Sequence, residues 1–194
     1  KELIHAYSNG FYTADGTMQT NNKPRISLYG PKKGLTPYLT GNYKEAVDSS
    51  NRVNLYFEND ILEPKFFVPD SSFSVQSRLE WLAGLFDGDG CLTNNNGTES
   101  LQLVSINKPF LNQLHLLLQE LGVDAKISKF REAEYRRLPM NNGSGESKDY
   151  WCEEAYRIMI AGSQLQKLLS LGFVCYRVMP TVRTQNREAT QFVK

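Results

Sequence analysis

Two aspartates that end similar segments are the residues with the clearest capacity for chemistry in this sequence. Residues 10–16 read GFYTADG and residues 84–90 read GLFDGDG, so Asp15 and Asp89 occupy the same place in two copies 74 residues apart. Each copy follows helical spacing, and the C-terminal end of a helix disfavours a carboxylate because the backbone dipole is negative there. A positive group is therefore expected beside each aspartate.

Two carboxylates that meet at paired helix ends repel each other, and a divalent cation removes that cost. Asp15 and Asp89, with the backbone carbonyls of Ala14 and Gly88, form a hard oxygen set that favours Mg²⁺, with Mn²⁺ as a substitute, over zinc. The two histidines and three cysteines show no spacing typical of a zinc site. A metal between two symmetric acids suits phosphodiester hydrolysis, and the symmetry predicts duplex DNA as the substrate.

The other aspartate of the second motif, Asp87, is not duplicated, because Thr13 stands in its place in the first copy. We therefore expect Asp87 to form local hydrogen bonds only. Small residues recur at about helical spacing in both copies, and they allow two helix backbones to approach closely. The two motif helices are predicted to pack on each other.

The elements that position these residues repeat loosely after each motif. The sequence predicts an α+β protein of two pseudo-two-fold related α-β-β-α-β-β-(α) units, an abbreviated first unit over 1–73 and a second over 74–194. A polar insert, 131–154, is expected to be a mobile loop that orders on DNA. Hydrophobic periodicity and helix caps predict strands at 25–30, 52–58, 101–107, 124–130 and 155–162, and helices at 32–39, 109–121 and from 163.

Composition excludes some classes of protein. The 194 residues carry a formal net charge of +1, which neither demands nor excludes a polyanionic partner. No apolar run is long enough to cross a bilayer, the first residues are too polar for a signal peptide, and the cysteines suggest no disulfide framework. We expect an intracellular monomer in the cytoplasm or nucleus, with no membrane association. The start at Lys1 suggests a domain from a longer polypeptide.

The second motif, LAGLFDGDG at 82–90, and its weaker partner resemble the LAGLIDADG homing endonucleases in their single-chain, two-motif form. The resemblance covers nearly the whole chain. It implies two saddle-shaped antiparallel sheets that straddle DNA, with the two motif helices packed at the centre. It also implies metal-dependent cleavage of both strands across the minor groove, leaving short 3′ overhangs, with Asp15 and Asp89 as the catalytic metal ligands.

The sequence also looks like the endonuclease portion of an intein, whose splicing domain is then a partner in the parent polypeptide. In such proteins a basic residue precedes a VP or IP element, and EPKFFVPD at 63–70 matches with Lys65. The second copy offers CYRVMP at 175–180 with Arg177, where the spacing to proline is one residue shorter. The resemblance implies that Lys65 is an active-site base or water-positioning residue and makes Arg177 its candidate counterpart. The splicing residues themselves are absent.

Basic and polar residues gather on the predicted strands and their turns, where outward side chains reach base edges or phosphates. We predict DNA contacts from Lys23, Arg25, Lys32, Lys33, Arg52, Asn54, Gln102, Lys129, Arg131, Arg136, Arg137 and Arg157.

Two rival interpretations remain at this point. The first keeps the fold and drops the chemistry, giving a catalytically inactive DNA- or RNA-binding module such as a maturase or a transcription regulator. The second is an α+β structural protein with a chance repeat, which predicts no salt-sensitive affinity for DNA. Metal-dependent nicking of DNA discriminates the enzyme from both.

Overall fold

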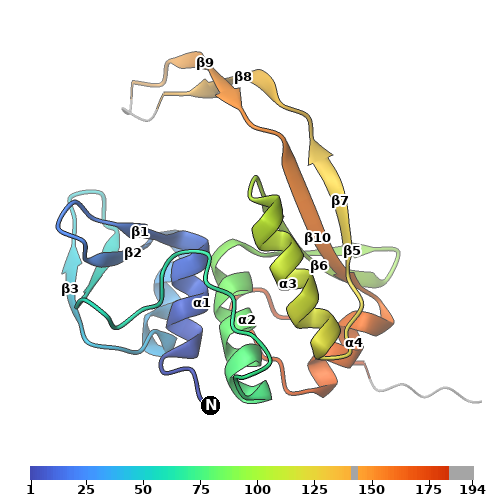
Figure 1. The fold of residues 1–194 in the computed structure, drawn as a ribbon. Helices are drawn as coiled ribbons and strands as arrows, with labels where there is room; N and C mark the ends of the chain where they lie inside the picture. The colour runs from blue at the N-terminus through green and yellow to red at the C-terminus, as the bar shows by residue number, and fades with distance from the viewer. Residues whose placement is uncertain (141–143, 184–194) are drawn as a thin grey trace, which may run out of the picture.

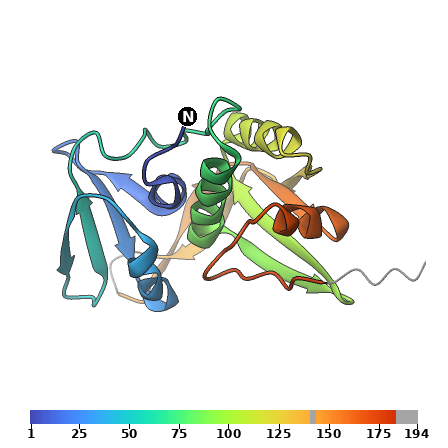
Figure 2. The ribbon, with the colours of Figure 1, turned by 90° about the horizontal axis from the view of Figure 1, so that it is seen from below.

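Two helices, α1 (Ala6–Asp15) and α2 (Val75–Asp89), lie side by side at the centre of the molecule, between two antiparallel sheets (Figures 1 and 2). Their backbones nearly touch. A Cβ added at Gly10 would lie 1.8 Å from the Trp81 carbonyl oxygen, and one added at Gly84 would lie 2.0 Å from that of Tyr7. The predicted packing of the two motif helices through small residues is confirmed.

The computed structural model describes residues 1–140 and 144–183. In the first unit a sheet of order β1-β2-β4-β3 packs beside α1. Its core-facing residues alternate along the strands, as Ile26 and Leu28 do on β2. The elements after α1 are β1 (Gly16–Met18), β2 (Pro24–Leu28), the 3₁₀ helix η1 (Gly30–Tyr38), β3 (Tyr43–Val47) and β4 (Val53–Phe57).

The second unit is larger, and two of its helices have side-chain N-caps, which α1 lacks. Ser74 accepts a hydrogen bond from the Ser77 N–H as the N-cap of α2, and Asn107 caps α3 through the Phe110 N–H. The sheet order is β5-β6-β10-β7. Its elements are β5 (Cys91–Asn95), β6 (Thr98–Ser105), α3 (Lys108–Glu120), β7 (Lys126–Arg131), β10 (Ala155–Ala161) and α4 (Ser163–Ser170).

The register of the two sheets repeats, which confirms the predicted two-unit α+β fold. Thr17 on β1 pairs with Arg25 on β2, and Cys91 on β5 pairs with Gln102 on β6. Thr17 and Cys91 each lie two residues after the motif aspartate, so Arg25 and Gln102 are structural equivalents. This equivalence extends the repeat from the motif helices into the sheets.

The expectation that 131–154 forms a loop is wrong. Strands β8 (Glu134–Pro139) and β9 (Ser147–Cys152) form an antiparallel hairpin that continues from β7 and β10 and arches over the upper side of the molecule (Figure 1). The Tyr135 and Trp151 rings pack across the two strands at 5.1 Å. Polar and charged residues dominate this segment, so it lacks the alternation of apolar and polar residues that predicts a half-buried strand.

A single hydrophobic core spans both units. Phe11, Trp81 and Phe86 on the two motif helices are fully buried, together with side chains from the inner face of each sheet. Trp151, by contrast, stays 52% exposed on the β8–β9 hairpin. No helix in the described part of the chain is long and apolar enough to cross a membrane.

Candidate functional site

Asp15 and Asp89 end α1 and α2, and the structure brings them together. The N–H groups of the next residues, Gly16 and Gly90, donate back to Tyr12 and Phe86 and close each helix in the same way. Gly88 lets the two helix ends meet, because a Cβ there would lie 2.4 Å from that of Ala14. Both acids therefore sit at one end of the helix pair.

Charged groups surround Asp89 at this helix end. Protein atoms around the carboxyl, and then the negative charge of Asp15, raise the pKa of Asp89 above its usual range, although the residue is exposed. Lys32, Lys65 and Arg177 act in the opposite direction. These three cations are the positive groups expected at the helix ends.

Lys32 pairs directly with one of the two acids. Its Nζ lies 2.5 Å from Oδ2 of Asp15, and the two side chains are only 14% and 20% exposed. The lysine comes from η1, whose first turn also contains a proline that suits the start of a helix. Sequence reasoning placed Lys32 on DNA. In this structure its ammonium neutralises Asp15.

Lys65 reaches the same end of α1 from the segment 58–74 that joins the two units. Its Nζ donates to the Gly16 carbonyl at 2.5 Å. Two residues earlier the Glu63 N–H donates to Oδ1 of buried Asn9 at 2.6 Å, which fastens the segment to α1. Lys65 and Asp89 also line a pocket of about 150 Å³.

Arg177 occupies the equivalent place in the second unit. Its Nη2 donates to the Gly90 carbonyl at 2.9 Å, as Lys65 does to Gly16. Its Nε also donates to the Asp87 carbonyl at 2.5 Å, and Nη2 lies within 3.4 Å of the Phe86 and Gly88 carbonyls. The guanidinium thus caps the last turn of α2, where a cation suits the helix dipole.

Asp87 is the residue that holds Arg177 in place. Its buried carboxylate accepts from the Tyr7 hydroxyl and from the N–H groups of three consecutive residues, Tyr176, Arg177 and Val178, at 2.8 to 3.1 Å. Burial and the Asp87 charge raise the pKa of Tyr7, so its hydroxyl stays a proton donor. Asp87 forms hydrogen bonds, as expected, but they are not local, because its partners come from α1 and from the tail 171–183, which Asp87 fixes to α2.

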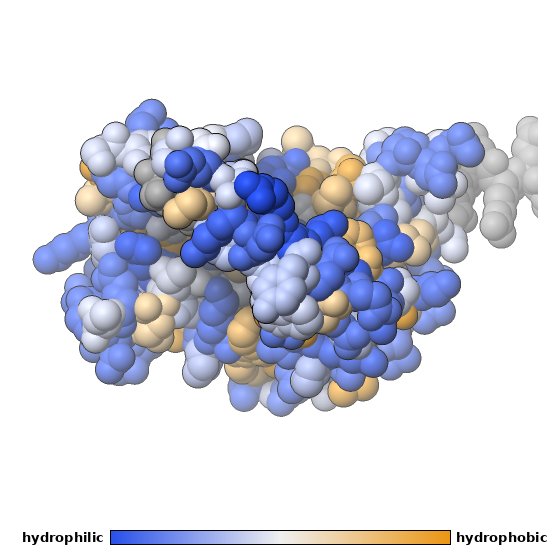
Figure 3. Space-filling model, turned by 90° about the horizontal axis from the view of Figure 1, so that it is seen from above, coloured by the Kyte–Doolittle hydropathy of each residue, from blue (hydrophilic) through white to orange (hydrophobic). Residues whose placement is uncertain are grey.

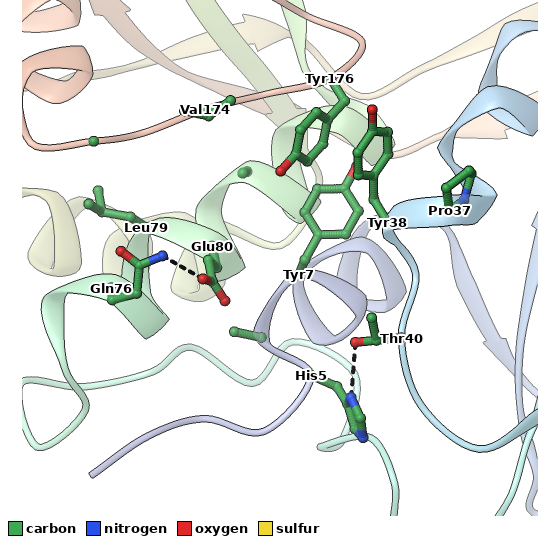
Figure 4. Close-up of a pocket in the computed structure, with 13 residues that line it drawn as sticks. His5, Tyr7, Pro37, Tyr38, Thr40, Gln76, Leu79, Glu80, Val174 and Tyr176 are labelled. Atoms are coloured by element: carbon green, nitrogen blue, oxygen red, sulfur yellow. Dashed lines mark hydrogen bonds between the residues drawn. The ribbon is translucent and has the colours of Figure 1, made fainter.

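Aromatic rings complete this attachment across the unit boundary. The Tyr38 and Tyr176 rings stack at 3.6 Å, and the Tyr7 ring meets Tyr176 edge-on (Figure 4). The three rings border a pocket of about 480 Å³ between η1, α2 and the tail. On the opposite side of the helix pair Phe66, the neighbour of Lys65, packs on Phe110 of α3 at 5.3 Å. Sequence reasoning missed these aromatic contacts.

The donors gathered here are oxygen atoms. The described residues contain no group of three histidine, cysteine or acidic side chains that would hold a metal by themselves. Two carboxylates are nevertheless enough for Mg²⁺, which proteins bind through one or two carboxylates while water and substrate phosphates fill the other positions. The side chains of Asp15 and Asp89 fit that mode, and the Gly88 carbonyl, at 3.4 Å from Arg177, retains capacity to accept more.

Several predicted DNA contacts lie on the outward faces of the sheets. Arg25 alternates with buried Ile26 on β2, and Gln102 and Arg157 alternate with the buried residues of β6 and β10. Arg136 and Arg137 are exposed on the hairpin, and Lys33 is half-buried on η1. Figure 3 shows that the upper face of the molecule is largely hydrophilic. This face, the hairpin and the acid pair lie on one side.

Other predicted contacts are occupied by neighbours. Asn54 is 4% exposed and hydrogen-bonds to Ser27 and Asp48, so we leave it out of the proposed contact set. Lys129 is paired with Tyr156 in the sheet, so the two side chains share a face, and its ammonium forms ion pairs with Glu132 and Glu154. We leave Lys129 out of the contact set as well. Lys23 pairs with Glu58 and Arg52 with Asp48, while Arg131 donates to the Glu153 carbonyl. Arg136, exposed on the hairpin, also pairs with Glu134.

Comparison with known proteins identifies relatives of two kinds. The family description of the LAGLIDADG-like domain matches residues 76–171. The ribonucleoside-diphosphate reductase large subunit of Invertebrate iridescent virus 6 is 38% identical over 194 residues, which cover 100% of this chain and 20% of that protein. The NrdEB subunit alpha of Bacillus subtilis (strain 168) is 27% identical over 200 residues, covering 84% of this chain and 18% of that protein. The chain thus spans about one fifth of these relatives.

Solved structures share the fold. The structure of I-DmoI in complex with DNA and Ca matches with a TM-score of 0.51 and 15% identity, over 91% of this chain and 92% of that one. The N-terminal LAGLIDADG domain of DUF199/WhiA matches with a TM-score of 0.51 and 18% identity, over 87% of this chain and 82% of that one. At these identities the likeness concerns the fold alone.

Proposed function

We propose that this chain, which carries a LAGLIDADG-like domain over residues 76–171, is a site-specific endonuclease that cuts both strands of duplex DNA with a divalent metal ion. The observation that carries the proposal is the meeting of Asp15 and Asp89 at the adjacent ends of α1 and α2, between two sheets with outward basic residues. The adjacency of the two acids suits cuts close together across the minor groove, with short 3′ overhangs.

The two acids are the proposed metal ligands. Asp15 and Asp89 offer carboxylate oxygens, and the backbone carbonyls of Ala14 and Gly88 lie beside them at the same helix ends. A bound Mg²⁺ or Mn²⁺ supplies Lewis acidity and a water of lowered pKa for in-line attack on a phosphodiester. The Ca present with DNA in the I-DmoI structure supports a divalent ion in this fold.

The basic residues have distinct proposed roles. Lys65 lines the same small pocket as Asp89, where its ammonium orients a water molecule and offsets the charge that develops on phosphate. Arg177 has its donors directed at three carbonyls of α2 and at that of the next residue, Gly90, so its proposed role is to hold the Asp89 end of the helix in position. Arg25, Gln102 and Arg157 are placed to contact DNA from the sheets.

The setting of the endonuclease follows from its relatives. Because the chain matches about one fifth of ribonucleoside-diphosphate reductase large subunits, we propose that it is the endonuclease segment of an intein inserted in such a subunit, acting as a monomer. Its target is then the DNA of a reductase gene that lacks the insert.

The test uses a plasmid that carries an uninterrupted reductase large-subunit gene. In Mg²⁺ we expect the protein to linearise this plasmid at the insertion point. Asp15→Asn and Asp89→Asn are each expected to remove double-strand cleavage while leaving salt-dependent DNA binding in place. Full cleavage by either variant would contradict the assignment of the acids.

One observation favours a second candidate function. The ion pair between Lys32 and Asp15 gives that acid a protein partner, as expected for a DNA-binding module without catalysis on the same fold. This candidate predicts tight, salt-dependent binding to DNA and no nicking in either Mg²⁺ or Mn²⁺. The plasmid assay separates the two candidates directly.

A further inference from the structure

The two motif aspartates, equivalent in sequence, have unequal surroundings. Asp15 is held in an ion pair with Lys32 at 2.5 Å. Within residues 1–140 and 144–183, the ion pairs include none to Asp89, on which the Lys32 charge acts only from beyond ion-pair distance. The repeat therefore breaks at the atoms that matter most for metal binding.

The register shows why the second unit has no equivalent of Lys32. Arg25 and Gln102 occupy matching positions, and counting on from Gln102 by the interval that separates Arg25 from Lys32 leads to Pro109. The nearest lysine is Lys108, and its ammonium lies 4.7 Å from the Tyr156 ring instead of at the helix ends. No side chain of α3 repeats the contact that Lys32 makes.

Lys32 lies at the edge of the site, where its ammonium can reach a second partner. The same ammonium lies 5.2 Å from the Tyr29 ring, which is 53% exposed on the edge of the site. A DNA phosphate at this edge is a stronger acceptor than the ring, because charge-assisted contacts to phosphate exceed cation–π contacts. Binding of a duplex thus offers Lys32 a new partner.

We infer that Lys32 is a resident counter-cation of Asp15, so that the half-site of Asp89 loads metal first and that of Asp15 loads only after Lys32 has moved to the DNA. A divalent ion cannot share the Asp15 oxygen with a half-buried ammonium at this distance without strong repulsion. This inference deepens the proposed endonuclease function and rests on its assignment of the two acids as metal ligands.

The test measures Mn²⁺ binding to the DNA-free protein by electron paramagnetic resonance of free Mn²⁺. In the native protein Asp89→Asn is expected to remove the stronger site, and Asp15→Asn to leave it. Lys32→Met is expected to raise the affinity of the weaker site about tenfold, the scale for removing one nearby positive charge near a protein surface. That gain must disappear when Asp15→Asn is added.

Two further variants serve as controls. Lys33→Met removes a neighbouring positive charge on η1 and is expected to leave Mn²⁺ affinity unchanged, and Lys32→Arg keeps the charge and is expected to behave as the native protein. If Lys32→Met does not unfold cooperatively, Lys32→Gln carries the same comparison. Unchanged Mn²⁺ affinity in the charge-removing variants Lys32→Met and Lys32→Gln, or a gain of the same size beside Asp15→Asn, would overturn the inference.

Strand order gives a second readout. At limiting Mg²⁺ the native protein is expected to nick one strand before the other, and Lys32→Met to make the two nicking rates more equal. Absence of all cleavage, with the Mn²⁺ results as expected, contradicts the endonuclease and leaves the role of Lys32 in place. Cleavage with equal strand rates in the native protein contradicts the role of Lys32 and leaves the endonuclease in place.

Discussion

The segments 58–74 and 171–183 carry Lys65 and Arg177 to matching carbonyls, those of Gly16 and Gly90, but they are fastened in different ways. Near Lys65 the first is held by the neutral side chain of Asn9, which accepts one N–H. The second is held by the buried carboxylate of Asp87, which accepts three N–H groups of the segment as well as the Tyr7 hydroxyl.

In both units the basic side chain contacts the equivalent backbone carbonyl, but different residues hold the segment that carries it. Lys65 makes one backbone contact and keeps its ammonium at the pocket shared with Asp89. Arg177 makes several contacts and is committed to capping α2. The first unit therefore supplies the chemically freer cation, and the second supplies the more rigid frame.

The helix contact tests the part of the comparison that is symmetric. Gly10→Ala and Gly84→Ala each drive a methyl group into backbone of the facing helix, and each is expected to lower the free energy of unfolding by about 3 kcal/mol or more. Urea unfolding measures this. The control is Gly34→Ala, whose added Cβ meets nothing within 4 Å and is expected to change stability by less than about 0.5 kcal/mol. A large difference in the free energy of unfolding between Gly10→Ala and Gly84→Ala would show that the two helices do not contribute equally to their contact.

The fastening residues test the asymmetric part. Asp87→Ala leaves several buried donors without an acceptor and is expected to lower the free energy of unfolding by about 2–3 kcal/mol, whereas Asn9→Ala is expected to lower it by about 1–2 kcal/mol. Limited proteolysis within 171–183 should accelerate in the first variant only. Equal losses of stability would show that the two segments are fastened equally.

The two basic residues should separate stability from catalysis. Arg177→Met removes the cap of α2 and is expected to lower the free energy of unfolding by about 1–2 kcal/mol, while Lys65→Met changes it by less than about 1 kcal/mol. For nicking of plasmid DNA we expect the reverse order, with the larger loss in Lys65→Met. A larger loss of nicking in Arg177→Met would reverse the assignment of roles.

The aromatic neighbours give the smallest expected effect. Tyr176→Leu removes the stack on Tyr38 and Phe66→Leu removes the contact with Phe110, and each is expected to lower the free energy of unfolding by about 0.5–1.5 kcal/mol. Both rings are 41% exposed, so burial does not favour either one. Thermal unfolding of the two variants tests whether the segments 58–74 and 171–183 contact the opposite unit with equal strength.

The repeat made the fold predictable. Because Asp15 and Asp89 align without gaps, the helix pair, the two sheets and the meeting of the acids all followed from the sequence, and the structure has this architecture. Strands β1, β3 and β5 were not located, because they are short and largely exposed and so lack the alternation that marks a strand. The hairpin of β8 and β9 escaped prediction for the same reason.

Side-chain partners were less predictable than elements. A lysine on a predicted turn reads as a phosphate contact, and nothing local distinguishes Lys32 from Lys33, since the ion pair with Asp15 depends on how η1 lies against α1. Asn54 is buried only because Ser27 and Asp48 converge on it from other segments. The absence of an acidic counterpart did correctly separate Asp87 from the duplicated acids.

The β8–β9 hairpin carries a consequence for how this protein changes over generations. An isolated pair of strands, with Tyr135 72% exposed, adds little to the core, so substitutions and changes of length there are nearly invisible to folding. Such changes affect only the contacts that the hairpin makes with a bound partner. In the proposed endonuclease it is therefore the place where preference for a new DNA sequence can change and be selected without loss of stability in the rest of the molecule.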